Sequence, residues 1–581
     1  MITPFALAGL AAGLALARQD APPAAEHPVK LLAHAELSAE LARLASAHPD
    51  LATLHLVGRS REGRAIEALC ITAAKERAEH PALLLVANLE GPRLFESGVA
   101  LHHAERLLSE AGDEKVRALL ESTVVWILPR ANPDAAEARF ATPRAERWTS
   151  TEGVDDDRDG RMGEDPPSDV NGDGLVTWMR VPDPDGTWMA DPKDARALVE
   201  ADRAKGERGV WKLYPEGRDL DHDEEASEDP PGDVRVDRNF PAGWEEHAAH
   251  AGLFATDEPE ARALAEFVMA QKNLCLVLVF DGWDDLVEKP KSVGDDAPAV
   301  KLVPPAGLLE SDAKQVEELG RRYREATENK TKGTSPTEGT FARWCYEHRG
   351  IVTLGAVLWD LPTEAPKSEA KPEEAKPADA PAEEKKEIEK KEGEKKDERE
   401  PSEDAKHLKW IDATGETWRF VPWTSFTHPE LGAVEIGGFA PYARLEPPEK
   451  ERGPIADRHF GFLLGLGAVL PRATLAECER EALGGDLWRV RAVVANDGFL
   501  PLFSKSAQRT QTTRPARVRL ILPEAAVLVA GEVQTLVSDL PGSGGRKEIL
   551  WLVHGPAAME IGVEVDSDHA GKAFRKAEEA R

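Results

Sequence analysis

The sequence contains few cysteines, fewer cationic than anionic side chains and few long apolar runs, and each of these features argues against a class of protein. Its 581 residues contain four cysteines, Cys70, Cys275, Cys345 and Cys478, too few and too scattered for a disulfide framework, so we expect buried free thiols. There are 73 Lys and Arg against 105 Asp and Glu, a formal net charge of −32, which argues against nucleic acid and anionic membrane surfaces as partners. After the first apolar segment, no run is long enough to span a membrane.

The N-terminus begins with a short apolar segment. The run from Pro4 to Ala17 ends in Ala15-Leu16-Ala17, and Arg18 follows. This is the pattern of a secretory signal peptide with a small-residue cleavage site, and it is short for a membrane span. We therefore predict a signal peptide over residues 1–17 and a secreted or periplasmic protein. A retained N-terminal anchor is the alternative.

The chain is too long for one core, and its first part has the pattern of an α/β domain, which we place at residues 28–362. Leu37, Leu41 and Leu44 are spaced as one face of a helix, and residues 98–108 again have a helical pattern. Four continuous apolar runs are typical of strands buried in a mixed or parallel sheet: residues 81–87, 123–128, 274–280 and 351–359.

The composition changes after this domain. Residues 363–406 consist almost entirely of Glu, Lys, Pro and Ala, which predicts a solvated, disordered linker or surface insertion. Residues 407–480 contain the segment HPELGAVEIGGF and a helical pattern at 460–470, and we expect them to return to the first domain. Over residues 483–572, short β-rich runs separated by turn residues predict a small antiparallel β-sandwich.

Two acidic segments have the alternating oxygen ligands of a calcium loop, each followed by a glycine. The candidate ligands are Asp155, Asp157, Asp159, Asp169, Asn171 and Asp173. Neither segment has the bidentate Glu at the twelfth loop position, where Pro166 and Arg180 stand, although Glu164 could substitute in the first. Calcium binding and a merely solvated acidic loop therefore both stay open.

Five short motifs follow one another along residues 30–360. They are GRSREGR (58–64), NLEGPR (88–93), NPD (132–134), VDRNFP (236–241) and GTFARWCYE (339–347), the last running into Gly350-Ile351. In this order, with HPELGAVEIGGF after the linker, they resemble the zinc carboxypeptidase family of the carboxypeptidase A type. The resemblance implies a mixed eight-stranded sheet flanked by helices. It also implies zinc held by two His and one Glu at the carboxyl ends of the central strands, with a Glu as general base.

The residues at the catalytic positions differ from those that the resemblance implies. The family's first loop resembles Asn-apolar-His-Gly-x-Glu, and here Glu90 stands at the His position and Arg93 at the Glu position. Asp281 stands at the third-ligand position and Val357 at the general-base position. Arg93 is a permanent cation that repels a divalent metal, and Val357 accepts no proton. We therefore expect no zinc and no catalytic residue, with Glu90 and Asp281 pairing with Arg93 in the vacated site.

Arg238 matches the family residue that binds the terminal carboxylate of the substrate, whereas the Asn that precedes it in the family is here Asp237. Arg238 could still bind a peptide or protein C-terminus, since a guanidinium forms a fork with a carboxylate. The alternative is that Arg238 pairs with Asp237 or Asp281.

The segment His102–Glu105 supplies a literal His-x-x-Glu, but no third ligand accompanies it. We interpret its histidines as surface or helix-face residues and not as a displaced zinc site.

Three functions are compatible with these features. The sequence favours a secreted pseudopeptidase with a peptide-binding, protein-binding or scaffold role. The alternatives are an active zinc carboxypeptidase that removes C-terminal residues from peptides, and a calcium-stabilised structural surface protein.

Overall fold

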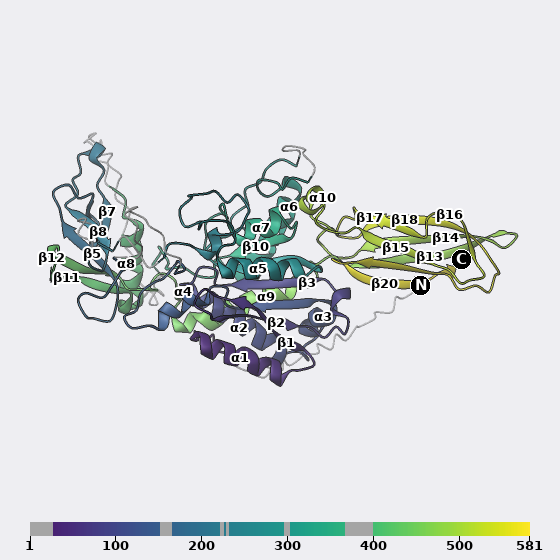
Figure 1. The fold of residues 1–581 in the computed structure, drawn as a ribbon, viewed down its shortest axis with the longest axis horizontal. Helices are drawn as coiled ribbons and strands as arrows, with labels where there is room; N and C mark the ends of the chain where they lie inside the picture. Colours follow the sequence, from purple (N-terminus) through teal and green to yellow (C-terminus); the bar gives the residue numbers. More distant parts are fainter. Residues whose placement is uncertain are drawn as a thin grey trace, which may run out of the picture.

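The computed structural model describes residues 27–151, 165–220, 226–227, 232–295, 302–365 and 399–580. Figure 1 shows an α/β domain in the middle, a second sheet on one side of it and a β-sandwich on the other. The predicted signal peptide lies outside the described residues, as does most of the predicted linker. Within the described residues, no helix combines the length and the apolar character that a membrane crossing requires.

The α/β domain is built around a six-stranded mixed sheet. Its strands, in spatial order, are β1 (Ala52–Arg59), β2 (Ala65–Ile71), β4 (Val124–Leu128), β3 (Ala82–Ala87), β9 (Leu274–Phe280) and β10 (Val352–Ala356). The last four are parallel to one another, while β1 and β2 pair antiparallel. All residues of the four parallel strands are buried, which explains their continuous apolar runs. The predicted fold class is confirmed, although the described sheet has six strands where the resemblance implied eight.

Helices cover both faces of this sheet. One face carries α1 (His34–Ala47), α2 (Leu94–Ser109), α3 (Glu114–Ser122), α6 (Glu310–Thr327) and α9 (Glu449–Leu466). The other face carries α5 (Pro259–Ala270) and α7 (Phe341–Glu347). The predicted helix face of α1 is confirmed, because Leu37, Leu41 and Leu44 are its buried residues. The four cysteines are buried and unpaired, as predicted.

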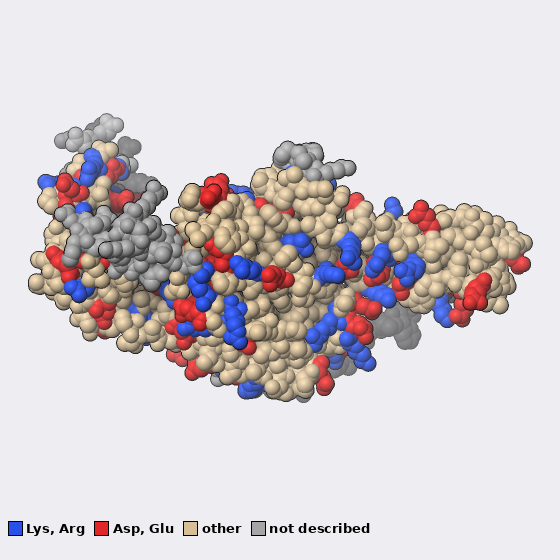
Figure 2. Space-filling model, in the orientation of Figure 1, with Lys and Arg blue, Asp and Glu red and all other residues tan. Residues whose placement is uncertain are grey.

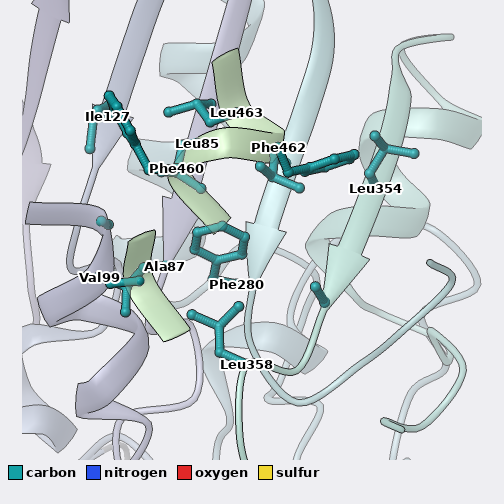
Figure 3. Packing of buried hydrophobic residues seen from close by; sticks show 14 of the residues in the cluster. Leu85, Ala87, Val99, Ile127, Phe280, Leu354, Leu358, Phe460, Phe462 and Leu463 are labelled. Carbon is teal, nitrogen blue, oxygen red and sulfur yellow. The ribbon is translucent and has the colours of Figure 1, made fainter. Parts of the chain in front are cut away.

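Helix α9 comes from far along the chain and completes the core of the α/β domain. Its Phe460, Phe462 and Leu463 lie among strand residues of the sheet, near Phe280 of β9 (Figure 3). Helix α8 (Glu403–Thr414) also contributes buried residues to this core. The predicted return of the chain to the first domain is therefore present, but it begins at α8, inside the segment expected to be linker.

A second six-stranded sheet lies beside the α/β domain and was not predicted. Its strands, in spatial order, are β11 (Phe420–His428), β12 (Gly432–Phe439), β5 (Trp178–Pro182), β8 (Trp211–Pro215), β6 (Trp188–Asp191) and β7 (Asp194–Glu200). The segment HPELGAVEIGGF forms the turn and second strand of the β11–β12 hairpin, which pairs with β5. This part of residues 407–480 therefore adds two strands to the second sheet, while its Phe420 and Phe439 pack against the core of the α/β domain.

The C-terminal region is a β-sandwich, as predicted. Its five-stranded sheet has the order β16 (Val527–Ala530), β18 (Gly545–His554), β14 (Leu487–Asn496), β13 (Ala473–Gly484) and β21 (Glu578–Glu579). Its four-stranded sheet has the order β17 (Gln534–Val537), β15 (Ala516–Ile521), β19 (Gly562–Ser567) and β20 (Gly571–Lys576). The two sheets enclose an apolar core of their own. The sandwich begins with β13, ten residues before the predicted boundary.

The short helix α10 (Lys505–Thr510) fixes the sandwich to the α/β domain. The backbone N–H groups of Lys505 and Ser506 donate to the carboxylate of Asp312 on α6, at 2.9 and 3.2 Å. The Ser504 hydroxyl donates to the carbonyl of Gly350. Gly350 has a φ of +68°, and a Cβ there would overlap Ala507, so the close approach needs glycine. The two bodies therefore meet through buried, specific contacts.

Candidate functional site

The predicted catalytic positions converge at one edge of the central sheet. Glu90 and Arg93 lie in the turn between β3 and α2, Asp281 follows β9, and Val357 follows β10. These three strands are neighbours and parallel, so their carboxyl ends meet at the same edge. The backbone N–H groups of Leu89 and Glu90 donate to Asp281 Oδ2 at 2.5 and 3.0 Å. The structure therefore brings the four positions together.

The turn after β3 is held by its own asparagine. Asn88 has a left-handed backbone, with a φ of 62°, and its Nδ2 donates to the carbonyl oxygens of Glu90, Gly91 and Arg93. Across the site, a Cβ at Gly282 would overlap the carboxylate of Glu90. The loop conformation and this glycine together place the Glu90 and Arg93 side chains beside the end of β9.

Arg93 occupies the centre of the site and is surrounded by carboxylates. Its side chain is 8% exposed, and its Nε lies 3.3 Å from Glu90 Oε2. Its two terminal nitrogens bind the two oxygens of Asp360 at 3.1 and 3.5 Å, and Nη1 lies 3.5 Å from Glu96 Oε1. The expected pair with Glu90 is present. The partners Asp360 and Glu96 were not predicted.

The expected ion pair between Asp281 and Arg93 is wrong. The carboxylate of Asp281 is fully buried and accepts three backbone N–H groups, from Leu89, Glu90 and Gly282. These three backbone N–H groups lie next to the ends of β3 and β9 and bind the carboxylate directly. The Arg93 side chain extends toward Asp360 instead. Asp281 thus ties the turn after β3 to the end of β9.

Burial shifts the protonation equilibria of the site. Burial opposes the charged form of Arg93, but the carboxylates of Asp360, Glu96 and Glu90 outweigh it and raise the pKa of Arg93 above its usual range. Burial raises the pKa of Glu96 to about 7, with Arg93 acting in the opposite direction. The pKa of Asp281 also lies well above its usual value because of burial and the neighbouring Glu90 and Asp237.

Val357 offers no replacement for a general base. Its side chain is completely buried, and a Cβ on Gly333 would overlap its Cγ2. Its carbonyl oxygen accepts from Asn329 Nδ2 at 2.8 Å, so its backbone is also engaged. An aliphatic side chain in this position has no lone pair with which to take a proton.

The side chains at the expected zinc-ligand positions do not fit zinc. Zinc needs three protein ligands with free lone pairs, and Arg93, at one of these positions, has no acceptor and brings a permanent positive charge instead. Within the described residues, no group of three or more His, Cys, Asp or Glu is arranged to hold a metal ion. The arrangement is that of an ion-pair cluster.

Arg238 lies beside this cluster and keeps an unpaired guanidinium. Its Nη1 donates to the carbonyl of Glu338 at 3.5 Å, and no ion pair joins it to Asp237, to Asp281 or to any other described residue. The predicted alternative, pairing with Asp237 or Asp281, is therefore absent here. Asp237 instead accepts the backbone N–H of Phe341 at 2.7 Å. Burial, reinforced by Glu90, raises the pKa of Asp237 to about 8.

The second calcium candidate is a turn stabilised by its own side chains. Asp169 accepts the backbone N–H groups of Gly172, Asp173 and Gly174, and Asn171 Oδ1 accepts that of Asp173. Asp173 in turn accepts from Leu175. Calcium binding here stays a prediction. The first candidate, Asp155, Asp157 and Asp159, lies outside the described residues.

The histidines of the segment His102–Glu105 lie on a helix face, as expected, but they are buried and not on the surface. His102 contacts the carbonyl of His27 and the carboxylate of Asp457, and His103 contacts the carbonyl of Ala456. These contacts anchor α2 against α9 and the N-terminal segment.

Comparison with known proteins gives the same picture of the α/β domain. Residues 37–174 match the sequence profile of the zinc carboxypeptidase family, and residues 472–578 match a domain of unknown function (DUF8731). The chain is 32% identical over 134 residues to carboxypeptidase E of Caenorhabditis elegans, which covers 22% of this chain and 28% of that protein. It is 30% identical over 124 residues to carboxypeptidase Z of Homo sapiens, covering 20% of this chain and 19% of that protein. The chain thus spans less than a third of the length of these relatives.

Among solved structures, carboxypeptidase A from Helicoverpa armigera matches 57% of this chain and 65% of that chain, at 16% identity and a TM-score of 0.36. A thrombin-activatable fibrinolysis inhibitor matches 56% of this chain and 65% of that chain, at 15% identity and a TM-score of 0.35.

Proposed function

We propose that this chain is a secreted, catalytically inactive member of the zinc carboxypeptidase family that binds peptide or protein C-termini without cleaving them. The observation that carries this proposal is the buried guanidinium of Arg93 at a metal-ligand position, held by Asp360, Glu96 and Glu90. A divalent cation placed there would be repelled by a permanent positive charge. Val357, at the general-base position, cannot take a proton from water.

Arg238 supports a retained binding role. Its guanidinium has no ion-pair partner in the described structure, and a carboxylate ligand would supply one. Asp237 beside it would repel such a ligand if charged. Because burial raises the pKa of Asp237 to about 8, this side chain is mostly neutral at pH 7 and opposes carboxylate binding only weakly.

The first experiment tests catalysis. We expect the purified chain, after dialysis against zinc, to hold less than one equivalent of metal and to leave a chromogenic C-terminal peptide substrate intact. The matched variant restores the family residues by Glu90→His, Arg93→Glu, Asp281→His and Val357→Glu, and we expect it to gain zinc. Stoichiometric zinc with peptide turnover in the unmodified chain would instead establish an active carboxypeptidase.

The second experiment tests binding. Fluorescent peptides with a free C-terminus should bind, and the same peptides with an amidated C-terminus should not. We expect Arg238→Gln to weaken binding by about tenfold or more, because a charge-assisted fork is lost. The exposed Arg208→Gln serves as the matched control. Absence of binding, together with a melting temperature that rises with calcium, would favour the calcium-stabilised structural protein.

A further inference from the structure

A cavity of about 210 Å³ lies where the α/β domain meets the β-sandwich. One wall consists of the end of α5 and the residues after α7, and the other consists of the segment before β15 and the turn between β19 and β20. Its charged lining residues are Lys272, Arg349, Arg514 and Asp568. Figure 2 shows Lys and Arg side chains gathered, among some Asp and Glu, where the central body meets the sandwich. Three cations thus line a small cavity with one carboxylate, although the whole chain carries a net charge of −32.

These three cations have no charge partner among the described residues. No ion pair and no hydrogen bond joins the side-chain nitrogens of Lys272, Arg349 or Arg514 to any of them, although the Thr512 hydroxyl donates to the backbone carbonyl of Arg349. The Nε of Arg349 is buried and lacks a hydrogen-bond acceptor. On helix α7, which ends just before Arg349, Arg343 by contrast pairs with both Glu338 and Glu347. A buried guanidinium N–H without an acceptor costs free energy, and an anion in the adjoining cavity would supply the acceptor that the described residues do not.

Helix ends explain only part of this positive charge. Lys272 follows the C-terminus of α5, and Arg349 lies just past α7, where cations are favourable because each helix C-terminus carries about half a negative charge. Two such ends and the carboxylate of Asp568 together offset about two of the three positive charges. Arg514 belongs to neither helix, so about one positive charge in the cavity is not offset by these groups.

We propose that this cavity binds a phosphate group, either as free phosphate or as part of a small phosphate monoester. Lys272, Arg349 and Arg514 line one small cavity and come from three separate chain segments, so an anion bound there has N–H donors available from more than one side. This suits the several acceptor oxygens of a tetrahedral anion better than the two oxygens of a carboxylate. The Thr513 hydroxyl lines the same space and supplies a further donor.

The cavity also has an apolar wall. Val268, Met269 and Ile351 line it opposite the charged groups of the sandwich side. Its volume exceeds that of a single phosphate ion, so there is room for a short carbon group attached to the anion. This favours a monoester as the source of the phosphate, and the experiment distinguishes it from the free ion.

A ligand in this position would connect the two bodies. Lys272 and Arg349 belong to the α/β domain and Arg514 to the sandwich, so one anion contacts both. Binding would thus add to the contacts of Asp312 with α10. We expect the ligand to raise the unfolding temperature of the full chain in proportion to its occupancy.

Isothermal titration calorimetry on the full chain tests this proposal. Inorganic phosphate and n-butyl phosphate are titrated at pH 7.5 and constant ionic strength, with sodium chloride and acetate as reference anions. Saturable 1:1 binding of phosphate but not of acetate is expected. Butyl phosphate binding more tightly, by up to about fourfold per buried CH₂, identifies the monoester, and equal affinity identifies the free ion.

Three single variants test whether phosphate binds at the cavity or elsewhere on the chain. We expect Arg349→Gln and Arg514→Gln each to weaken phosphate binding by about tenfold or more, whereas Lys409→Gln, an exposed charge removal on α8, leaves it unchanged. Arg514 is exposed, so its substitution should leave the ligand-free unfolding temperature intact and report on binding alone. If phosphate binds no better than acetate, or if the three variants behave alike, the proposal is wrong.

Discussion

The two arginine-centred regions of this molecule have opposite electrostatic surroundings. Around Arg93, at the edge of the central sheet, carboxylates supply every nearby charge partner, and the guanidinium is nearly buried. Around Arg349 and Arg514, at the junction with the sandwich, no carboxylate of the described residues forms an ion pair with the cations, although Asp568 lines the same cavity. A cation whose donors are all engaged inside the protein contributes to the fold, whereas a cation with free donors is available to a ligand. The predictions below test that distinction.

The largest effect is expected from Arg93→Met. Removing the guanidinium leaves Glu90, Glu96 and Asp360 close together without a counter-charge, which should lower the free energy of unfolding by about 3–5 kcal/mol. Urea unfolding at pH 7.5 measures this loss. Arg321→Met, which breaks two exposed ion pairs on α6, is the matched control and should change the free energy of unfolding far less, because solvent screens exposed pairs. Equal losses in the two variants would contradict a structural role for Arg93.

The next effect concerns Asp237→Asn and depends on pH. The folded pKa of Asp237, about 8, lies above its unfolded value, so the native state holds the proton more tightly. Stability should therefore fall as pH rises from about 4 to 8, by at most about 1.4 kcal/mol for each pH unit from this residue. Asn keeps the acceptor for Phe341 N–H without a charge.

The variant should consequently match the unmodified chain near pH 4, where Asp237 is protonated in both states to a large extent, and exceed its stability at pH 8. Urea midpoints at the two pH values measure this, and a difference that is the same at both would show that the Asp237 carboxyl does not titrate as described.

A smaller effect is expected from Gly282→Ala. The added Cβ overlaps the carboxylate of Glu90, which is the mobile end of a side chain, so the site should adjust at a cost of about 1 kcal/mol. Thermal unfolding measures the change. Combining Gly282→Ala with Glu90→Ala should remove most of the penalty, and a fully additive pair would show that the two residues do not interact.

The smallest effect is expected from Arg514→Gln in the absence of ligand. Since no described residue pairs with this guanidinium, its loss should change the free energy of unfolding by no more than about 0.5 kcal/mol. The free energy of unfolding should therefore change far less in Arg514→Gln than in Arg93→Met, which separates a cation available to a ligand from one that stabilises the fold. A large loss of stability in ligand-free Arg514→Gln would show that its charge serves the fold.

Much of the α/β domain could be predicted from local pattern. Strands β3, β4 and β9 are buried on both faces, so each appears in the sequence as a continuous apolar run. The second sheet has short, half-buried strands, and β12 pairs with β5 across more than two hundred residues, a contact that no local pattern encodes. Strand β13 was missed because Glu477, Glu479 and Glu481 give it a polar appearance.

The candidate site could be predicted in part. The motif positions placed Glu90, Arg93, Asp281 and Val357 at one edge, because they follow neighbouring parallel strands. Which carboxylates pair with Arg93 depends on side-chain reach: Glu96 lies one helical turn further on, and Asp360 follows β10. The spacing from Arg93 to Glu96 was visible in the sequence, whereas the choice between Asp281 and Asp360 required the structure.

The position of α9 has a consequence for how the chain is made. The core of the α/β domain is completed by Phe460, Phe462 and Leu463, which follow β10 by about a hundred residues. When only the strands of the central sheet have emerged from the ribosome, the apolar surface that α9 covers in the folded protein is exposed. It stays exposed until residue 466 has emerged. A fragment that stops after β10 should therefore aggregate, while a second fragment that carries α8 and α9 should rescue it when both are synthesised together.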